Sequence, residues 1–207
     1  MANSMSEQER KRIEAVRALC ILDTAPEERF DRFTRVVKRL FNAPHAYISI
    51  VDTDRQWFKS ADGLNVTETP RALSFCTHAI REDQVMVVNH TAQDTRFSDN
   101  PFVTGEPHIR FYAGCPLHEA NGYRVGTLCI TDTKPRDFSD EDRGLLADVA
   151  SMAEQELASM QLATLDELTK LSNRRGFLHL AEHSSEFCQR LGLPAALMVI
   201  DVDGLKP

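Results

Sequence analysis

Acidic residues near the end of the chain are the first groups whose types and spacing suggest chemistry. Asp201 and Asp203 follow the apolar run that ends at Ile200, and Lys206 comes three residues after Asp203. Carboxylates at the end of a strand can hold a divalent cation. The alternative is that acidic residues simply end the strand at a turn, and spacing alone favours that structural interpretation.

Cysteines and histidines form a second group of reactive side chains. The five cysteines are scattered and contain no C-x-x-C pair, so the sequence predicts neither a disulfide framework nor a zinc site. His78, His90 and His108 match no compact spacing of metal ligands. Cys76 and Cys115 are expected to behave as small buried hydrophobic residues rather than as reactive thiols.

The composition limits the class of protein. The 207 residues are 42% hydrophobic and 27% charged, which is typical of a globular chain with a real core. A net charge of -7 without a long Lys/Arg run argues against a nucleic-acid-binding protein. The polar start of the chain has no signal-peptide pattern, and no apolar run approaches the roughly 18 residues of a membrane span. We therefore expect a cytoplasmic protein with no membrane segment.

Helical patterns occupy the first part of the chain. Ile13, Val16 and Leu19 form one apolar stripe and predict an opening helix over residues 7–19. Thr24 and Glu27 have the spacing of a capping box, which predicts that a second helix begins there. The apolar face of this second helix must pack on a large partner such as a sheet.

Strand patterns follow the second helix. Segments 46–51 and 56–60 predict one hairpin, and segments 111–117 and 123–131 predict another around Asn121-Gly122 in a type I′ turn. The turn-rich excursion 62–106 between them predicts a short helix at 75–81, a strand at 85–88 and the walls of a binding pocket.

A long helix is predicted from Asp140 to about Leu165, beginning at a capping box formed by Ser139 and Asp142. Its apolar residues step by four and three alternately along one stripe, which consists of Leu146, Ala150, Ala153, Leu157 and Met160. This stripe is either a coiled-coil seam between two copies or a face packed on the chain's own sheet, and the sequence favours neither. The order of elements predicts an α+β fold.

Five segments of the chain resemble GAF domains, which recur in bacterial cyclases and histidine kinases. They are 75–80 (FCTHAI), 87–90 (VVNH), 94–97 (DTRF), 108–114 (HIRFYAG) and 126–129 (GTLC). The resemblance runs from about Ile21 to Glu156 and implies a central antiparallel sheet with helices on one side and a ligand pocket on the other. By the same resemblance, the pocket candidates are Cys76, His78, Phe111, Tyr112 and Cys115. The adjacent Cys-His pair of bilin-binding members is absent.

The last part of the chain is similar to the start of GGDEF domains, which make cyclic di-GMP from GTP. The first match begins at Asp166 and includes Asn173 and Phe177, with Lys170 and Ser172 where the family usually has Gly and Pro. The second match, 200–206 (IDVDGLK), resembles the family's first strand and the loop after it.

The GGDEF resemblance also implies a nucleotide site. It gives Asp201 and the Val202 carbonyl a role in binding Mg²⁺, and it gives Gly204, Leu205 and Lys206 a role in binding phosphate. GTP and Mg²⁺ are expected only in a complete cyclase domain. The Gly-Gly-Asp/Glu-Glu-Phe hairpin does not occur in the sequence, so we expect no cyclase activity from this chain.

Together these patterns predict four segments: an N-terminal helix (1–20), a GAF sensory domain (21–156), a continuation of the coupling helix (157–165) and the N-terminal part of a GGDEF domain (166–207). The expected function is the sensory portion of a diguanylate cyclase, with a small molecule or a protein partner at the GAF pocket. We also expect a homodimer through the long helix. Two alternatives are a GAF-based enzyme such as a free methionine sulfoxide reductase and the sensor portion of a histidine kinase.

Overall fold

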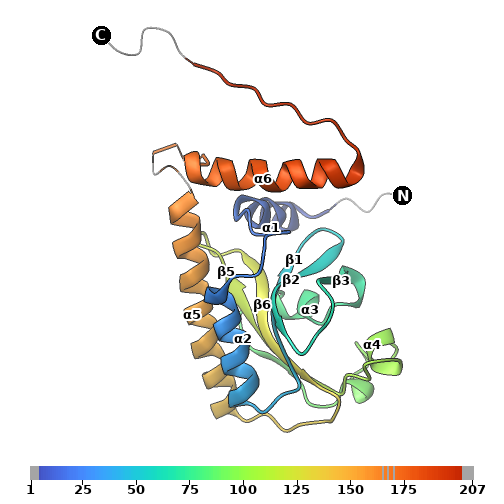
Figure 1. The fold of residues 1–207 in the computed structure, drawn as a ribbon. Coiled ribbons are helices and arrows are strands. Elements are labelled where there is room, and N and C mark those ends of the chain that lie inside the picture. Colours follow the sequence, from blue (N-terminus) through green and yellow to red (C-terminus); the bar gives the residue numbers. More distant parts are fainter. Residues whose placement is uncertain (1–4, 165, 167, 170, 202–207) are drawn as a thin grey trace. The chain divides into compact units, whose positions relative to one another are not determined.

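The structure is a computed structural model that describes residues 5–164, 166, 168–169 and 171–201. The chain divides into two compact units, residues 1–163 and residues 164–207. The first unit confirms the predicted α+β class, because it contains one antiparallel sheet flanked by helices (Figure 1). No helix in the described part of the chain is both long and apolar enough to cross a bilayer.

The sheet of the first unit has six strands in the order β3-β2-β1-β6-β5-β4, and each pair of neighbours is antiparallel. Both predicted hairpins are confirmed, as β1–β2 and as β5–β6. The strands are β1 (His45–Val51), β2 (Arg55–Asp62), β3 (Glu68–Pro70), β4 (Met86–Val88), β5 (Phe111–His118) and β6 (Arg124–Asp132).

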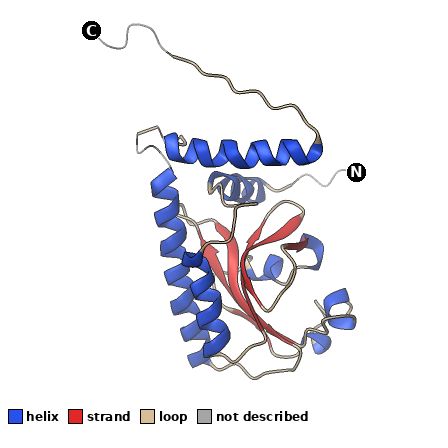
Figure 2. Ribbon diagram, in the orientation of Figure 1, coloured by secondary structure: helices blue, strands red, loops and turns tan. Residues whose placement is uncertain are grey.

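Helices cover the two faces of this sheet differently. Figure 2 shows α2 and α5 along one face, while the short helices of the excursion lie toward the other face. The helices of the first unit are α1 (Glu7–Ala18), α2 (Glu28–Leu40), α3 (Cys76–Ala79), α4 (Pro101–Thr104) and α5 (Asp140–Thr164), with 3-10 turns η1 (Arg71–Leu73) and η2 (Thr91–Gln93).

Two hydrophobic cores lie on the opposite faces of the sheet, because successive strand side chains point to opposite sides. On the face of α2 and α5, Ile48 and Ile130 pack with Phe30 of α2 and with the apolar stripe of α5. On the other face, Tyr47 and Cys129 pack with residues of the excursion. The period-2 pattern of β1 and β6 therefore separates a helix-facing core from an excursion-facing core.

The apolar stripe of α5 is buried within its own unit. Its five residues, from Leu146 to Met160, are at most 6% exposed, and all belong to the helix-facing core. The stripe therefore packs on the chain's own sheet, and this resolves the two alternatives that the sequence left open. The predicted capping box is confirmed, since Ser139 Oγ accepts from the Asp142 amide at 3.1 Å and Asp142 accepts from the Ser139 amide at 2.9 Å.

The predicted capping box at Thr24 is wrong. Helix α2 begins at Glu28, and its N-cap residue Glu27 makes no capping hydrogen bond through its side chain. Thr24 Oγ1 instead donates to the Ile21 carbonyl at 2.7 Å and accepts from Lys59 at 2.6 Å. The buried ammonium of Lys59 needs acceptors, and both Thr24 and Glu27 supply them.

The predicted type I′ turn between β5 and β6 is also wrong. A type I′ turn needs positive φ at both central residues, but of Asn121 and Gly122 only Gly122 has one, at 85°. The loop spans residues 119–123 and is organised by the Glu119 carboxylate, which accepts from the amides of Asn121 and Tyr123 at 2.9 and 3.2 Å. A side chain at the start of the loop therefore determines the turn.

The second unit contains helix α6 (Arg174–Leu191). Asn173 caps its start by accepting from the Gly176 amide at 3.0 Å, and Gly192 ends it with φ 64°. The strand expected to end at Ile200 is not formed, and Met198 and Ile200 are about four-fifths exposed. A strand needs neighbouring strands for its backbone hydrogen bonds, and the described residues of this unit contain none.

Candidate functional site: an apolar cavity under the excursion

A cavity of about 400 Å³ lies on the excursion-facing side of the sheet. Strands β1, β2 and β6 contribute His45, Tyr47, Gln56, Phe58 and Thr131 to its lining. The excursion and the residue after it contribute most of the rest, including Gly63, Leu64, Leu73, Ser74, Phe75, Phe102, Glu106 and Pro107. The excursion was predicted to build a pocket, and it supplies these walls.

Packed aromatic rings form the base of the cavity. Tyr47 and Phe58, from neighbouring strands, meet edge to face with ring centroids 5.1 Å apart. Phe75 stacks on Tyr112 at 5.3 Å and contacts Phe97 at 4.7 Å. Phe97 and Tyr112 do not line the cavity themselves but pack behind Phe75. Because all three rings are almost fully buried, the position of Phe75 in the wall is fixed before any ligand arrives. The cavity therefore offers a rigid apolar surface to a ring or a hydrocarbon chain.

A few polar groups line the same cavity. The Ser74 hydroxyl and the Gln56 carboxamide are hydrogen-bonded to each other. Thr131 Oγ1 and His45 Nδ1 are 3.3 Å apart. Burial lowers the pKa of His45, and Lys38 adds to this effect while Asp132 opposes it, so the imidazole is neutral near pH 7. A neutral imidazole and a carboxamide can orient a ligand by hydrogen bonds without adding charge.

Gly63 is required by the backbone at the rim of the cavity. Its φ is 95°, and a Cβ on this residue would lie 2.2 Å from the Pro44 carbonyl oxygen. Only glycine tolerates both the positive φ and this close approach. The residues after this turn, 64–66, line the cavity.

The predicted pocket residues Cys76 and Tyr112 lie together, but neither lines this cavity. Tyr112 Oη donates to Cys76 Sγ at 3.3 Å, and Cys129 Sγ lies 3.7 Å from Cys76 Sγ. Burial raises the pKa of the Cys76 thiol, but hydrogen bonds from Cys129, Ser49, Thr127 and Tyr112 outweigh this and bring it to about 7. These groups form the layer directly behind Phe75.

His78 lies beside this layer at the edge of the excursion. Its ring meets Phe97 edge to face at 4.9 Å, and burial lowers its pKa, with Arg81 and Arg96 adding to the effect. His78 does not line the cavity either.

The structure places Phe111 and Cys115 on the other face of the sheet. Both belong to the helix-facing core, whereas Tyr112 belongs to the excursion-facing core. Burial raises the pKa of Cys115 to about 12, and Glu154 adds to this effect. Strand alternation therefore divides the five predicted residues, and Cys76 and Cys115 do not meet.

Of the predicted metal and phosphate residues, only Asp201 is described, and it lies exposed in the second unit. Val202, Gly204, Leu205 and Lys206 lie outside the described residues. Among the residues that are described, no three His, Cys, Asp or Glu side chains come close enough to hold a metal ion. The Mg²⁺ role of Asp201 stays a prediction.

Reasoning from the sequence missed Gln56, Phe58 and Ser74. The alternation in β2 could have shown that Gln56 and Phe58 share one face, but it does not say which face receives the excursion. Ser74 and Phe75 directly precede the motif residue Cys76, so the sequence could have placed them near the pocket. Cys129 lies in the segment 126–129 (GTLC), but its spacing does not indicate that it meets Cys76.

Comparison with known proteins agrees with this architecture. The family model of the GAF domain matches residues 25–157. In solved structures, the free methionine-R-sulfoxide reductase of Neisseria meningitidis is similar with a TM-score of 0.56 and 17% identity, over 78% of this chain and 96% of that chain. The GAF domain of the Acinetobacter phosphoenolpyruvate-protein phosphotransferase has a TM-score of 0.52 and 14% identity, over 77% and 96%. These identities show the fold alone.

A curated relative is similar over a longer stretch. Cyclic di-GMP phosphodiesterase PA2567 of Pseudomonas aeruginosa is 39% identical over 199 residues, which make up 95% of this chain. The chain spans about a third of the length of that relative, 33%.

Proposed function

Because the chain belongs to the GAF domain family, we propose that its first unit is the sensory part of a protein of cyclic di-GMP signalling. The observation that carries the sensory role is the apolar cavity, which the excursion closes against the sheet. The relative named as a cyclic di-GMP phosphodiesterase supports the signalling system. The ligand that fits the cavity is a small, largely apolar molecule with one or two hydrogen-bonding groups.

Strand β6 offers a path from the cavity to α5. Thr131 lines the cavity on one face of this strand, while Leu128 and Ile130 face the core that contains the α5 stripe. A ligand that moves β6 therefore also acts on the packing of α5. Because packed cores adopt discrete arrangements, a small shift at β6 can move the helix as a unit. We propose this as the route by which binding reaches the second unit.

The second unit is proposed to be the beginning of a GGDEF domain. The motif around Asp166 supports this assignment: Asp166 accepts hydrogen bonds from the Thr169 amide and hydroxyl at 2.9 and 2.8 Å. The exposed apolar run 197–200 also supports it, since such a run is typical of a strand that pairs within a larger sheet. In that domain Asp201 and Val202 would hold Mg²⁺, which neutralises charge on GTP phosphates when bound.

The experiment uses the complete gene product that contains this chain. Leu73→Trp places a large ring in the cavity, and Leu40→Trp makes the same change on the exposed surface of α2. We expect Leu73→Trp to alter the synthesis or hydrolysis of cyclic di-GMP by removing its response to ligand, while Leu40→Trp leaves the response intact. If cyclic di-GMP turnover responds to the ligand equally in Leu73→Trp and Leu40→Trp, the cavity is not the sensory site. Absence of any cyclic di-GMP turnover or binding would contradict the signalling assignment.

The reductase alternative rests on two cysteines that act together. The structure brings Cys76 close to Cys129 instead of Cys115, and both of these thiols are fully buried. An enzyme that reduces a sulfoxide needs a thiol that its substrate can reach. We therefore retain the sensory function as the proposal.

A further inference from the structure

A second, polar groove lies apart from the apolar cavity. It measures about 730 Å³ and opens between the first turn of α1, the region of η1 and α3, and the loop between β5 and β6. None of its described lining residues lines the apolar cavity. Four arginines line the groove: Arg12, Arg71, Arg81 and Arg124.

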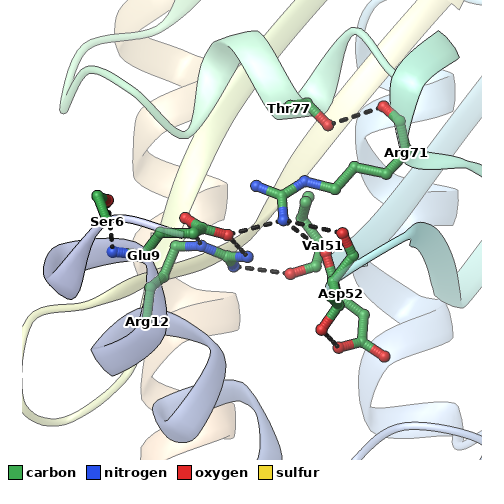
Figure 3. Close-up of polar contacts among 8 residues, drawn as sticks. Ser6, Glu9, Arg12, Val51, Asp52, Arg71 and Thr77 are labelled. Carbon is green, nitrogen blue, oxygen red and sulfur yellow. Dashed lines mark hydrogen bonds and ion pairs between the residues drawn. The ribbon is translucent and has the colours of Figure 1, made fainter. Parts of the chain in front are cut away.

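Two of these arginines are fixed by the fold. Arg12 donates to the Val51 carbonyl at 2.7 Å and to both carboxylate oxygens of Glu9 at 2.9 and 2.8 Å. Arg71 donates to the same Glu9 carboxylate at 2.7 Å and to the Asp52 carbonyl at 2.9 Å (Figure 3). Both guanidinium groups are thus held in place, and a ligand would not have to order them.

Only part of the positive charge in the groove is neutralised. Glu9 lies between Arg12 and Arg71, and Asp83 pairs with Arg124 at 3.0 Å. The Glu119 carboxylate also lies against the groove, because it accepts from the amides of the lining residues Asn121 and Tyr123. Counting these three carboxylates against the four arginines leaves one positive charge. Burial would raise the pKa of Glu9, but the hydrogen bonds from Arg12 and Arg71 outweigh it and hold the pKa at about 2. The groove therefore keeps a surplus of positive charge within a chain of net charge -7.

Hydrogen-bond donors also remain for a ligand. All the contacts of the Arg71 side chain within the described part of the chain use its Nη1 atom, which leaves Nε and Nη2 for an acceptor. Figure 3 shows this end of Arg71 turned away from Asp52. Arg81 is exposed in the turn just after α3, and its side chain makes no hydrogen bond or ion pair among the described residues. Tyr123, half-buried in the lining, adds a ring surface for the organic part of a ligand.

We propose that this groove binds a small phosphorylated molecule. A phosphate monoester carries a charge of about −1.5 to −2 at pH 7, so it would be attracted by the surplus positive charge of the groove. Arginine presents planar pairs of N–H donors that fit phosphate oxygens. The groove's volume falls within the range of small-molecule sites, roughly 300 to 1,000 Å³. Such a ligand would bridge α1 to α3 and the β5–β6 loop, so it would tie the opening helix to the domain.

The test is calorimetric titration of the 207-residue protein with inorganic phosphate, with phenyl phosphate and with an acidic peptide. We expect saturable binding of phenyl phosphate that is tighter than that of inorganic phosphate and weakens as salt is raised. Arg81→Gln should weaken phenyl phosphate binding about tenfold, which corresponds to one charged hydrogen bond. Arg39→Gln, the same change on the exposed surface of α2, should have no effect.

Three results would overturn the proposal. They are no saturable binding of either phosphate, binding that Arg81→Gln and Arg124→Gln leave unchanged, and binding of the acidic peptide in preference to phenyl phosphate. The last would identify a protein partner instead. Amide NMR shifts at Gly122 and Thr77 on titration provide a second readout, because both residues line the groove but neither contributes a charge to it.

Discussion

Glu27 Oε1 lies 2.6 Å from the ammonium group of Lys59, whose side chain has no exposed surface. The ammonium also donates to Thr24 Oγ1 at 2.6 Å and to the Ala25 carbonyl at 2.8 Å, so all three of its protons have acceptors. The segment before α2 is therefore shaped by a cation buried in β2. This arrangement explains why Thr24 and Glu27 do not cap the helix.

Removing the charge of Glu27 should destabilise the first unit. Glu27→Gln leaves the buried ammonium without its counter-ion, and we expect the free energy of unfolding to fall by about 2 to 3 kcal/mol. Urea denaturation measures this change. Glu28→Gln, which removes an exposed carboxylate one residue later, should leave the midpoint nearly unchanged. Lys59→Met in the Glu27→Gln background should recover most of the loss, and failure to recover would contradict the electrostatic explanation.

Gly126 and Gly144 should respond to alanine in opposite ways. A Cβ on Gly126 would lie 1.8 Å from the Ser49 carbonyl oxygen, so Gly126→Ala must separate β1 from β6. We expect a loss of about 3 kcal/mol or more in the free energy of unfolding. Nothing lies within 4 Å of a Cβ on Gly144, so Gly144→Ala should stabilise α5 by about 0.5 to 1 kcal/mol. Thermal unfolding of both variants measures these changes. A loss of stability in both would show that the α5 backbone at Gly144 is also constrained.

The anchoring of α1 should depend on pH in the acid range. The folded-state pKa of Glu9, about 2, lies below its ordinary value of 4.5 because Arg12 and Arg71 outweigh the effect of burial. Its stabilising contribution is therefore fully present above pH 4.5 and is lost as the pH falls toward 2. We expect wild type to exceed Glu9→Gln in stability at about pH 6, with a smaller difference at about pH 3. A difference between wild type and Glu9→Gln that does not change with pH would rule out this linkage.

Truncating a side chain should lower stability much more on the buried side of α5 than on its exposed side. Leu157 is fully buried in the helix-facing core, so Leu157→Ala should lower the free energy of unfolding by about 3 kcal/mol. Met152 is 55% exposed on the other side, and Met152→Ala should cost much less. Chemical denaturation of both variants is the measurement. Equal losses of stability in the two variants would mean that the side of α5 that carries Met152 is covered in solution.

Association through α5 stays a prediction, and it now concerns the exposed side of the helix. Leu145 and Met152 lie two helical turns apart and are 38% and 55% exposed. If two copies associate through this side, Leu145→Glu with Met152→Glu should shift the sedimenting species from dimer to monomer. Ala92→Glu, on a surface of the excursion, is the control for added charge. A wild-type protein that is monomeric at high concentration would refute association through α5.

Local patterns predicted most of the elements of the first unit. The apolar spacing of Ile13, Val16 and Leu19 gave α1, and the mutual caps of Ser139 and Asp142 marked the start of α5. These signals depend on residues three or four positions apart, which the helix itself brings together. The two failures have different causes. Lys59, which is distant in the sequence, draws Thr24 and Glu27 to its ammonium group, whereas the turn at Asn121 is organised by Glu119 of the same loop.

The sequence by itself determined the α+β class, the two hairpins and the extent of α5, because periodicity and capping are local properties of the chain. Only the tertiary structure decided which face of each strand meets the excursion, and so separated Phe111 and Cys115 from Tyr112 and Cys76. It alone buried the α5 stripe in its own unit and brought the arginines of α1, η1, β6 and the turn after α3 to one groove. The physical reason is that strand alternation limits a side chain to two faces, while the packing of distant segments selects between them.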